Sequence, residues 1–195
     1  MDNFISIIYA ICGISYTVLS GRGKYFCFIF GLISSLLYSI LSFKQALWGT
    51  FFLNFLYYIP IQILSLLNWH KNTDKKRKTI KKTYLGLKKF LILAFLASIL
   101  SIILGFILFL NKDNAPYQDG FITIFSMLGA YLTLRRAIEQ WIVWTIVNFI
   151  TLIMWIILII KGANTMAVPL LWFIYLILGI YFYFKWQKEL KQGQL

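Results

Sequence analysis

Apolar residues fill seven long stretches of this chain, and short polar connectors separate them. A helix that spans a membrane needs about 20 predominantly apolar residues. The stretches that approach this length are Phe4–Leu19, Tyr25–Phe43, Leu47–Leu67, Tyr84–Leu110, Phe121–Leu134, Trp141–Ile160 and Met166–Trp186. The first and fifth are short, so they need polar flanking residues or a locally thinner bilayer. The pattern predicts an all-α integral membrane protein with seven transmembrane helices.

The composition supports a membrane protein. The chain has 195 residues and is 61% hydrophobic and 19% aromatic, whereas soluble domains are about 45–50% apolar. This length suits a single transmembrane domain over residues 1–195. The N-terminus runs from Met1 directly into apolar sequence without a basic segment, which predicts a retained helix rather than a signal peptide.

The placement of the basic residues predicts the orientation of the chain. The net charge is +13, and the segment 71–89 holds nine of the 19 Lys and Arg residues. With the N-terminus outside and seven crossings, 16 of these 19 fall on the inner side. Cytoplasmic loops carry such an excess, where it faces anionic lipid. We therefore expect the N-terminus outside, the C-terminus in the cytoplasm and no nucleic-acid partner.

A shift of 117 positions aligns the two ends of the chain. The coincident pairs include Lys44 with Lys161, Tyr58 with Tyr175 and Trp69 with Trp186. The shift predicts a parallel 3+1+3 repeat, with repeat one over 4–69, a linker helix over 84–110 and repeat two over 117–187. In such folds the substrate binds near the membrane midplane between the repeats.

The sixth apolar stretch carries a WxxWxxxN pattern. Its residues Trp141, Trp144 and Asn148 fall within roughly 60° of arc on an α-helix, and Thr151 lies close to the same stripe. Two indoles and a carboxamide on one helix face suit a planar aromatic solute better than they suit lipid. The pattern predicts a substrate-binding face.

Polar residues in other apolar stretches extend the candidate site. Asn54, Tyr58 and Gln62 recur every four residues near Pro60, and Ser126 lies in the fifth stretch. Polar groups kept in a bilayer usually face the protein interior or a cavity. Hydrogen bonding between helices is an equally ordinary role for them.

Tryptophans near helix ends commonly form a belt at the membrane interface. We expect that role for Trp48, Trp69 and Trp186.

The sequence shows no catalytic or metal-binding set. Cys12 and Cys27 lie in apolar stretches, and the one histidine, His70, adjoins a lysine-rich loop. The apolar stretches also lack the carboxylates expected of a proton-coupled pump. We expect no metal, no cofactor and no enzymatic activity, which leaves passive carriage of a solute.

The chain resembles the PnuC-type transporters of nicotinamide riboside over nearly its whole length. The residues that carry the resemblance are Asp119, Ser126, Arg135–Arg136, Glu139, Trp141, Trp144 and Asn148. A second matching segment is FGLISSLLYSILSFKQALWG, followed by NFLYYIPIQ and a closing Trp69. Many relatives carry Asp after the Trp-Gly pair, where this chain has Thr50.

The resemblance implies a SWEET-like fold, a homotrimer and residence in the bacterial inner membrane. It also implies facilitated diffusion of nicotinamide riboside into the cell for NAD synthesis, with trapping by a cytoplasmic kinase. In this family the motif residues contact the substrate, and that role carries onto Trp141, Trp144 and Asn148. For Asn54 and Gln62 the correspondence is weaker.

The chemistry of the residues agrees with this substrate. Indole faces attract a pyridinium cation by up to ~2 kcal/mol when it is desolvated, and Asn148 can pair with a carboxamide. Hydroxyls of Tyr58, Thr151 or Ser126 can bind the ribose. A phosphate needs basic residues, which the apolar stretches lack, so we expect the nucleoside rather than the mononucleotide.

Three other readings remain open from the sequence. A related carrier could move thiamine, riboflavin or a deoxynucleoside, and thiamine is also an aromatic cation. A membrane enzyme would need acids, bases or nucleophiles that the stretches do not offer. A structural helix bundle would use the polar residues only to join its helices.

Overall fold

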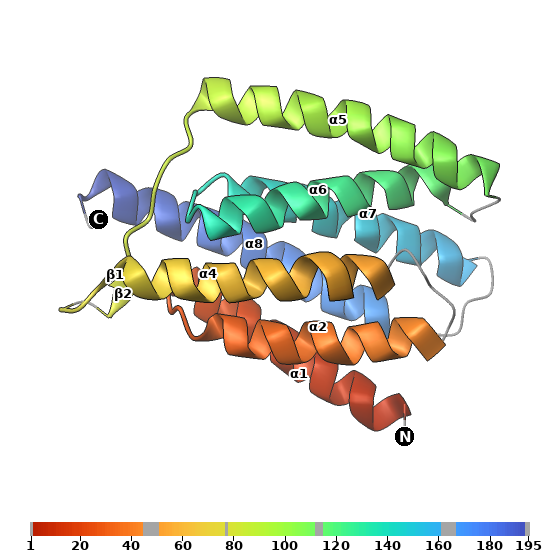
Figure 1. Ribbon diagram of the computed structural model, residues 1–195, viewed down its shortest axis with the longest axis horizontal. Helices are drawn as coiled ribbons and strands as arrows, with labels where there is room; N and C mark the ends of the chain where they lie inside the picture. Colours follow the sequence, from red (N-terminus) through yellow and green to blue (C-terminus); the bar gives the residue numbers. More distant parts are fainter. Residues whose placement is uncertain (1, 45–50, 77, 112–114, 161–166, 194–195) are drawn as a thin grey trace. The chain divides into compact units, whose positions relative to one another are not determined.

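The computed structural model describes every residue except 1, 45–50, 77, 112–114, 161–166 and 194–195 (Figure 1). The helices are α1 Asp2–Gly21, α2 Cys27–Lys44, the π-helix η1 Leu53–Tyr58, α4 Ile59–Lys71, α5 Leu87–Leu110, α6 Pro116–Leu134, α7 Gln140–Ile160 and α8 Ala167–Lys191. Each of the seven predicted stretches coincides with one of these helices or with the continuous pair η1 and α4. The all-α prediction is therefore confirmed. Trp48, Thr50 and Lys161 lie outside the described residues.

The contacts divide the chain into two units. Unit 1 contains residues 1–83, 133–136 and 188–195, and unit 2 contains residues 84–132 and 137–187. The single domain and the 3+1+3 repeat stay predictions.

In unit 1, α2 packs against both α1 and α4. Near the start of α1 the rings of Tyr9 and Tyr38 stack with centroids 4.8 Å apart. At the other end Trp69 meets Phe28 edge to face, at 4.9 Å and 88°. Its indole Nε1 donates a hydrogen bond to the carbonyl of Thr133 at 2.7 Å. Trp69 is fully buried, so the predicted role in an interfacial belt is wrong for this residue.

The third predicted helix begins with a π-helical segment rather than an α-helical one. The π-helix η1 is followed at once by α4, which has Pro60 in its first turn. Because Pro60 has no N–H, it cannot continue the α-helical bonding pattern back to the preceding turn. Short π segments are rare and occur frequently at functional sites. Asn54 and Tyr58 both lie in this segment.

A short hairpin, absent from the predicted elements, follows α4. Strand β1, Thr73–Asp74, pairs antiparallel with β2, Thr79–Ile80. The amide of Ile80 donates to the carbonyl of Gly23 at 3.0 Å, and Lys24 Nζ donates to the carbonyl of Lys78 at 2.8 Å. The hairpin therefore joins the connector between α1 and α2.

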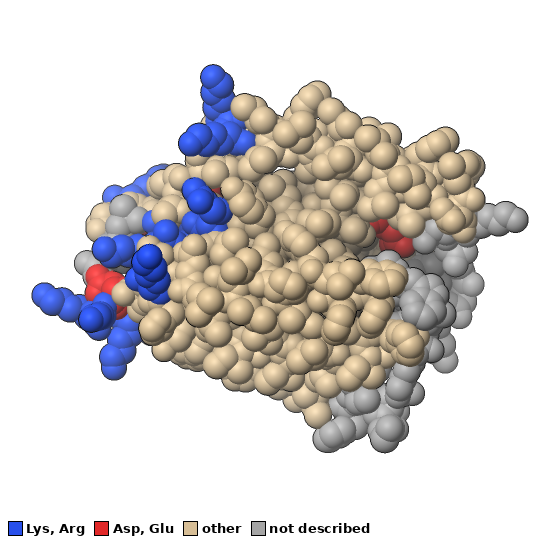
Figure 2. Space-filling view, viewed as in Figure 1, with Lys and Arg blue, Asp and Glu red and all other residues tan. Residues whose placement is uncertain are grey.

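Further contacts join other basic connectors to this part of unit 1, and Figure 2 shows Lys and Arg side chains gathered on one part of the visible face. Arg136 Nη1 donates to the carbonyl of Lys81 at 2.9 Å, and Lys82 forms an ion pair with Glu189 near the C-terminus. Burial and then the charge of Arg135 lower the pKa of Arg136. Parts of four basic regions thus come together within unit 1, namely Arg22–Lys24, residues 71–82, Arg135–Arg136 and the C-terminal lysines Lys188 and Lys191.

Unit 2 contains α5 to α8. Helices α5 and α6 approach closely at Gly120, where a Cβ would lie 2.7 Å from the backbone nitrogen of Gly105. Phe125 and Leu128 of α6 share an apolar core with Val143 of α7. Trp186 of α8 is fully buried, so the predicted belt role is wrong for this tryptophan too.

Much of the outer surface is apolar, as a lipid-facing surface must be. Large hydrophobic side chains are exposed along α5, among them Phe95 at 66% and Ile102 at 64%. Within the described part of the chain, Leu87–Leu110 and Pro169–Lys191 are long and apolar enough to cross a membrane. This surface fits the predicted membrane protein.

Glu139 fixes the start of α5. Its carboxylate accepts hydrogen bonds from the amide of Leu85 at 3.0 and 3.1 Å and from the amide of Gly86 at 3.1 Å. Gly86 has a φ of +92°, a conformation that favours glycine. One buried carboxylate thus holds a tight turn that other side chains would strain.

We expect Glu139→Ala to lower the free energy of unfolding by about 2–3 kcal/mol, because two amides lose a charged acceptor. Glu139→Gln keeps one oxygen acceptor, so its free energy of unfolding should fall by less. Thermal unfolding of the detergent-solubilised variants measures both changes. An Ala variant as stable as the wild type would contradict this role.

Candidate functional site

Helix α7 carries the WxxWxxxN stripe, as predicted. Trp141 is 3% exposed, Asn148 is 6% exposed and Thr151 is 3% exposed. Trp144 is half-buried. The stripe therefore faces the protein, and Trp144 is its most accessible aromatic side chain.

The indole of Trp144 lies against α6 at Gly129. A Cβ on Gly129 would lie 2.9 Å from Cε2 of the indole, 3.1 Å from Cζ2 and 3.2 Å from Cδ2. Ser126, predicted as a site residue, is buried on α6 three residues before Gly129. Residues three apart share a helix face, so Ser126 lies on the face of α6 that meets this indole.

Asn148 is 6% exposed, and its amide forms no side-chain hydrogen bond with the residues that the structure describes. Its amide atoms are not among the described atoms that are both fully buried and without a partner, so part of the amide stays accessible. A carboxamide offers two donors and one acceptor. One turn after Trp144, this side chain can pair with a planar polar group without losing a bond inside the protein.

Trp141 turns toward α8 instead. Its ring packs against Phe182 with centroids 5.2 Å apart and meets Trp186 edge to face at 5.6 Å. Its Nε1 is buried without a hydrogen-bond partner among the described residues. Trp141 therefore packs against α8, and its indole N–H has no acceptor among the described residues.

Thr151 also lies on the stripe, but its hydroxyl already has a partner within the helix. Its hydroxyl donates to the carbonyl of Val147 at 2.8 Å, a bond within its own helix. The hydroxyl oxygen still offers acceptor lone pairs. Thr151 can therefore accept a hydrogen bond from a ligand, but its hydroxyl proton is already used in the bond to Val147.

The other three predicted site residues lie in unit 1. Gln62 Nε2 donates to Ser35 Oγ at 2.6 Å, while its Oε1 is buried without a partner among the described residues. Asn54 is 5% exposed, and both Asn54 and Tyr58 interact with other residues. Five predicted residues thus lie on α6 and α7, and three lie on η1 and α4.

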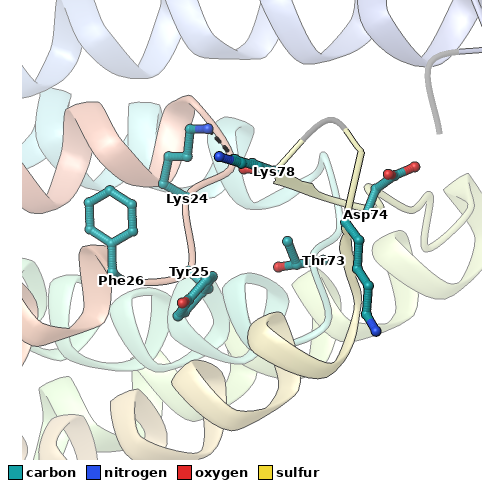
Figure 3. Close-up of a pocket in the computed structure, with 7 residues that line it drawn as sticks. Lys24, Tyr25, Phe26, Thr73, Asp74 and Lys78 are labelled. Atoms are coloured by element: carbon teal, nitrogen blue, oxygen red, sulfur yellow. Dashed lines mark hydrogen bonds between the residues drawn. The ribbon is translucent and has the colours of Figure 1, made fainter.

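A pocket of about 270 Å³ opens elsewhere in unit 1 (Figure 3). Its lining consists of Lys24, Tyr25, Phe26, Thr73, Asp74, Lys75 and Lys78. Figure 3 shows Lys24 reaching toward Lys78, whose carbonyl it bonds. None of the eight predicted site residues lines it, so this surface pocket is separate from the candidate site.

Gly129 is a neighbour of Trp144 that the sequence did not reveal. A glycine inside an apolar helix has several ordinary explanations, and the residue that covers it comes from a neighbouring helix. Only the packing of α6 against α7 shows which side chain uses the space.

The chain is similar to known proteins over nearly its whole length. A family model described as nicotinamide mononucleotide transporter matches residues 3–188. The nicotinamide riboside transporter PnuC of Neisseria mucosa is 29% identical, over 98% of this chain and 74% of the relative. The protein of the same name from Haemophilus influenzae is 28% identical, over 98% of this chain and 82% of the relative. A crystal structure of the vitamin B3 transporter PnuC is similar with a TM-score of 0.82 and 28% identity, and the match covers 98% of this chain and 83% of that one.

The two tryptophans of the stripe should differ in their effect on stability. Trp141→Ala removes a fully packed ring and should cost about 3 kcal/mol or more. Trp144→Ala should cost less than half as much, because its indole is half-buried. Thermal unfolding in detergent measures both, and equal losses would contradict the different roles assigned to the two rings.

Proposed function

The chain belongs to the nicotinamide mononucleotide transporter family, and on that premise we propose that it carries nicotinamide riboside across a bacterial inner membrane. The PnuC-type resemblance is confirmed by the family match and by the similar curated proteins. The prediction that the chain is a transporter and not an enzyme is confirmed by the same comparisons. The proteins of Neisseria mucosa and Haemophilus influenzae are named for the riboside, and this supports it as cargo here.

The observation that carries the proposal is the carboxamide of Asn148, which forms no side-chain hydrogen bond with the described residues, one turn after the half-buried indole of Trp144. Nicotinamide has a carboxamide on a flat ring, and in the riboside this ring is a cation. An amide pair with Asn148 and a cation–π contact with Trp144 match these two groups. Ser126 and Thr151 supply hydroxyls for the ribose.

Charge favours the riboside over the mononucleotide. Helices α6 and α7 contain no Lys or Arg, so a phosphate dianion at their shared face would lack a cation. Burying an unpaired charge is strongly unfavourable. Thiamine, also an aromatic cation, is the alternative cargo.

Passive transport is the second part of the proposal. The only acidic residue of α6 and α7 is Asp119, in the first turn of α6. A proton-coupled carrier uses ionisable groups within its membrane helices. The riboside therefore moves down its own gradient and is retained by phosphorylation inside the cell.

The basic end of unit 1 supports the proposed orientation. Four basic regions far apart in the sequence meet there through the contacts of Lys24, Arg136 and Lys82. The positive-inside rule assigns this end to the cytoplasm. The N-terminus then lies outside and the C-terminus inside.

The aromatic contacts of each unit support the proposed 3+1+3 repeat. Trp69 closes the third helix of repeat one and meets Phe28, near the start of the second helix, edge to face. Trp186, its partner in the 117-residue shift, meets Trp141 in the same manner near the start of α7. Both tryptophans are fully buried.

Two further parts of the proposal rest on the resemblance, the contacts in unit 1 and the homotrimer. Asn54 and Gln62 are proposed as further substrate contacts, and Tyr58 is proposed beside them because its hydroxyl can bind the ribose. Gln62→Leu should weaken riboside binding. The homotrimer is tested by native mass spectrometry of the detergent-solubilised protein.

Proteoliposomes containing the chain should take up radiolabelled nicotinamide riboside with saturation, whereas uptake of the mononucleotide should stay near that of empty liposomes. The reason is the missing counter-charge for the phosphate. A proton ionophore should leave the initial rate unchanged. Equal uptake of both compounds would contradict the riboside proposal. Uptake of thiamine alone would identify thiamine as the cargo.

Replacement of Asn148 by leucine separates binding from structure. We expect Asn148→Leu to weaken riboside binding about 10- to 100-fold, because the ligand amide loses its partner. The unfolding temperature should stay the same or rise, since no hydrogen bond within the protein is lost. Calorimetric titration and thermal unfolding measure the two effects. A variant that is less stable but binds normally would identify Asn148 as a structural residue.

A further inference from the structure

Gly129 lacks the usual structural reasons for a glycine. Its φ is not among the positive values, which among described glycines occur at Gly23, Gly86 and Gly193. It lies in the interior of α6, where glycine is less favourable than alanine. The backbone therefore does not require it, and the space around it must supply the reason.

That space is filled by the indole of Trp144. Three ring atoms lie 2.9–3.2 Å from the position of a Cβ on Gly129, closer than carbon atoms normally approach. The ring is rigid, so the whole indole would have to move. To restore an ordinary carbon–carbon distance it would shift by roughly 0.7 Å.

We propose that Gly129 is a specificity-determining residue that sets how far the Trp144 indole stands from the substrate. One face of the ring lies on the α6 backbone, and the half-buried indole keeps part of its surface exposed. A side chain at position 129 would push the indole into the space that a flat substrate ring occupies. This inference rests on the proposed function, because it takes Trp144 as the surface on which the substrate ring lies.

Four variants test the inference through binding of nicotinamide riboside. Gly129→Ala should weaken binding at least tenfold, since small displacements of a positioning group have large effects. Trp144→Phe should weaken it through the smaller ring. The double variant should bind no more weakly than Trp144→Phe alone, because a single ring leaves room for the added methyl group. Additive losses would overturn the inference.

Gly179→Ala is the matched control. It is a second helical glycine in unit 2, and its Cβ would meet Thr145 Oγ1 at 2.8 Å rather than a site residue. Riboside binding should stay within about twofold of the wild type, less than 0.5 kcal/mol. A loss equal to that of Gly129→Ala would show that any added methyl group disturbs binding, and would overturn the specific role.

A measurement without ligand tests the contact itself. In protein labelled with 5-fluorotryptophan, the ¹⁹F resonance that disappears in Trp144→Phe belongs to Trp144. Gly129→Ala should shift this resonance, while Gly179→Ala should leave it in place. A Trp144 resonance that does not move in Gly129→Ala would overturn the inference whatever the substrate is.

The outcomes separate this inference from the proposed function. A wild-type protein that does not bind the riboside overturns the proposed function and the specificity role together. Normal binding by both the wild type and Gly129→Ala overturns the inference alone. If Gly129→Ala does not fold, the double variant with Trp144→Phe should fold and bind, and its failure to fold would contradict the steric explanation.

Discussion

A bilayer interior offers polar groups no water, and this constraint governs the whole chain. Every backbone amide and carbonyl in that region must bond within the protein, which is why the apolar stretches form helices. Charged side chains collect in the connectors for the same reason. Against this background Asn148 stands out, because its amide lies in a membrane helix and forms no side-chain hydrogen bond with the described residues. This is why we propose it as a ligand contact.

The residues of the WxxWxxxN motif and Glu139 contact several neighbours of α7. Glu139 holds the turn before α5, and Trp141 packs on α8 through Trp186. Trp144 lies on α6 at Gly129. The same short segment thus contacts three other helices beside the proposed substrate contacts.

The helices could be predicted from the sequence because length and hydropathy report directly on the bilayer. The stripe on α7 was also predictable, since helical spacing alone determines which residues share a face. The π-helix at Leu53–Tyr58 was not, because its winding depends on local competition around Pro60. The burial of Trp69 and Trp186 was missed because a tryptophan at a helix end can face either lipid or a neighbouring helix. The role of Gly129 depends on a contact between helices, which no single helix pattern contains.

The central claim is that the α7 stripe recognises a cationic aromatic ring, and calorimetric titration with two forms of the ligand tests it most directly. Nicotinamide riboside has a charged pyridinium ring, whereas its reduced dihydro form has nearly the same shape without the charge. A cation–π contact with Trp144 predicts that the charged form binds about tenfold or more tightly. It also predicts that Trp144→Leu abolishes this preference. Equal affinities for the two forms in the wild-type protein would contradict the account.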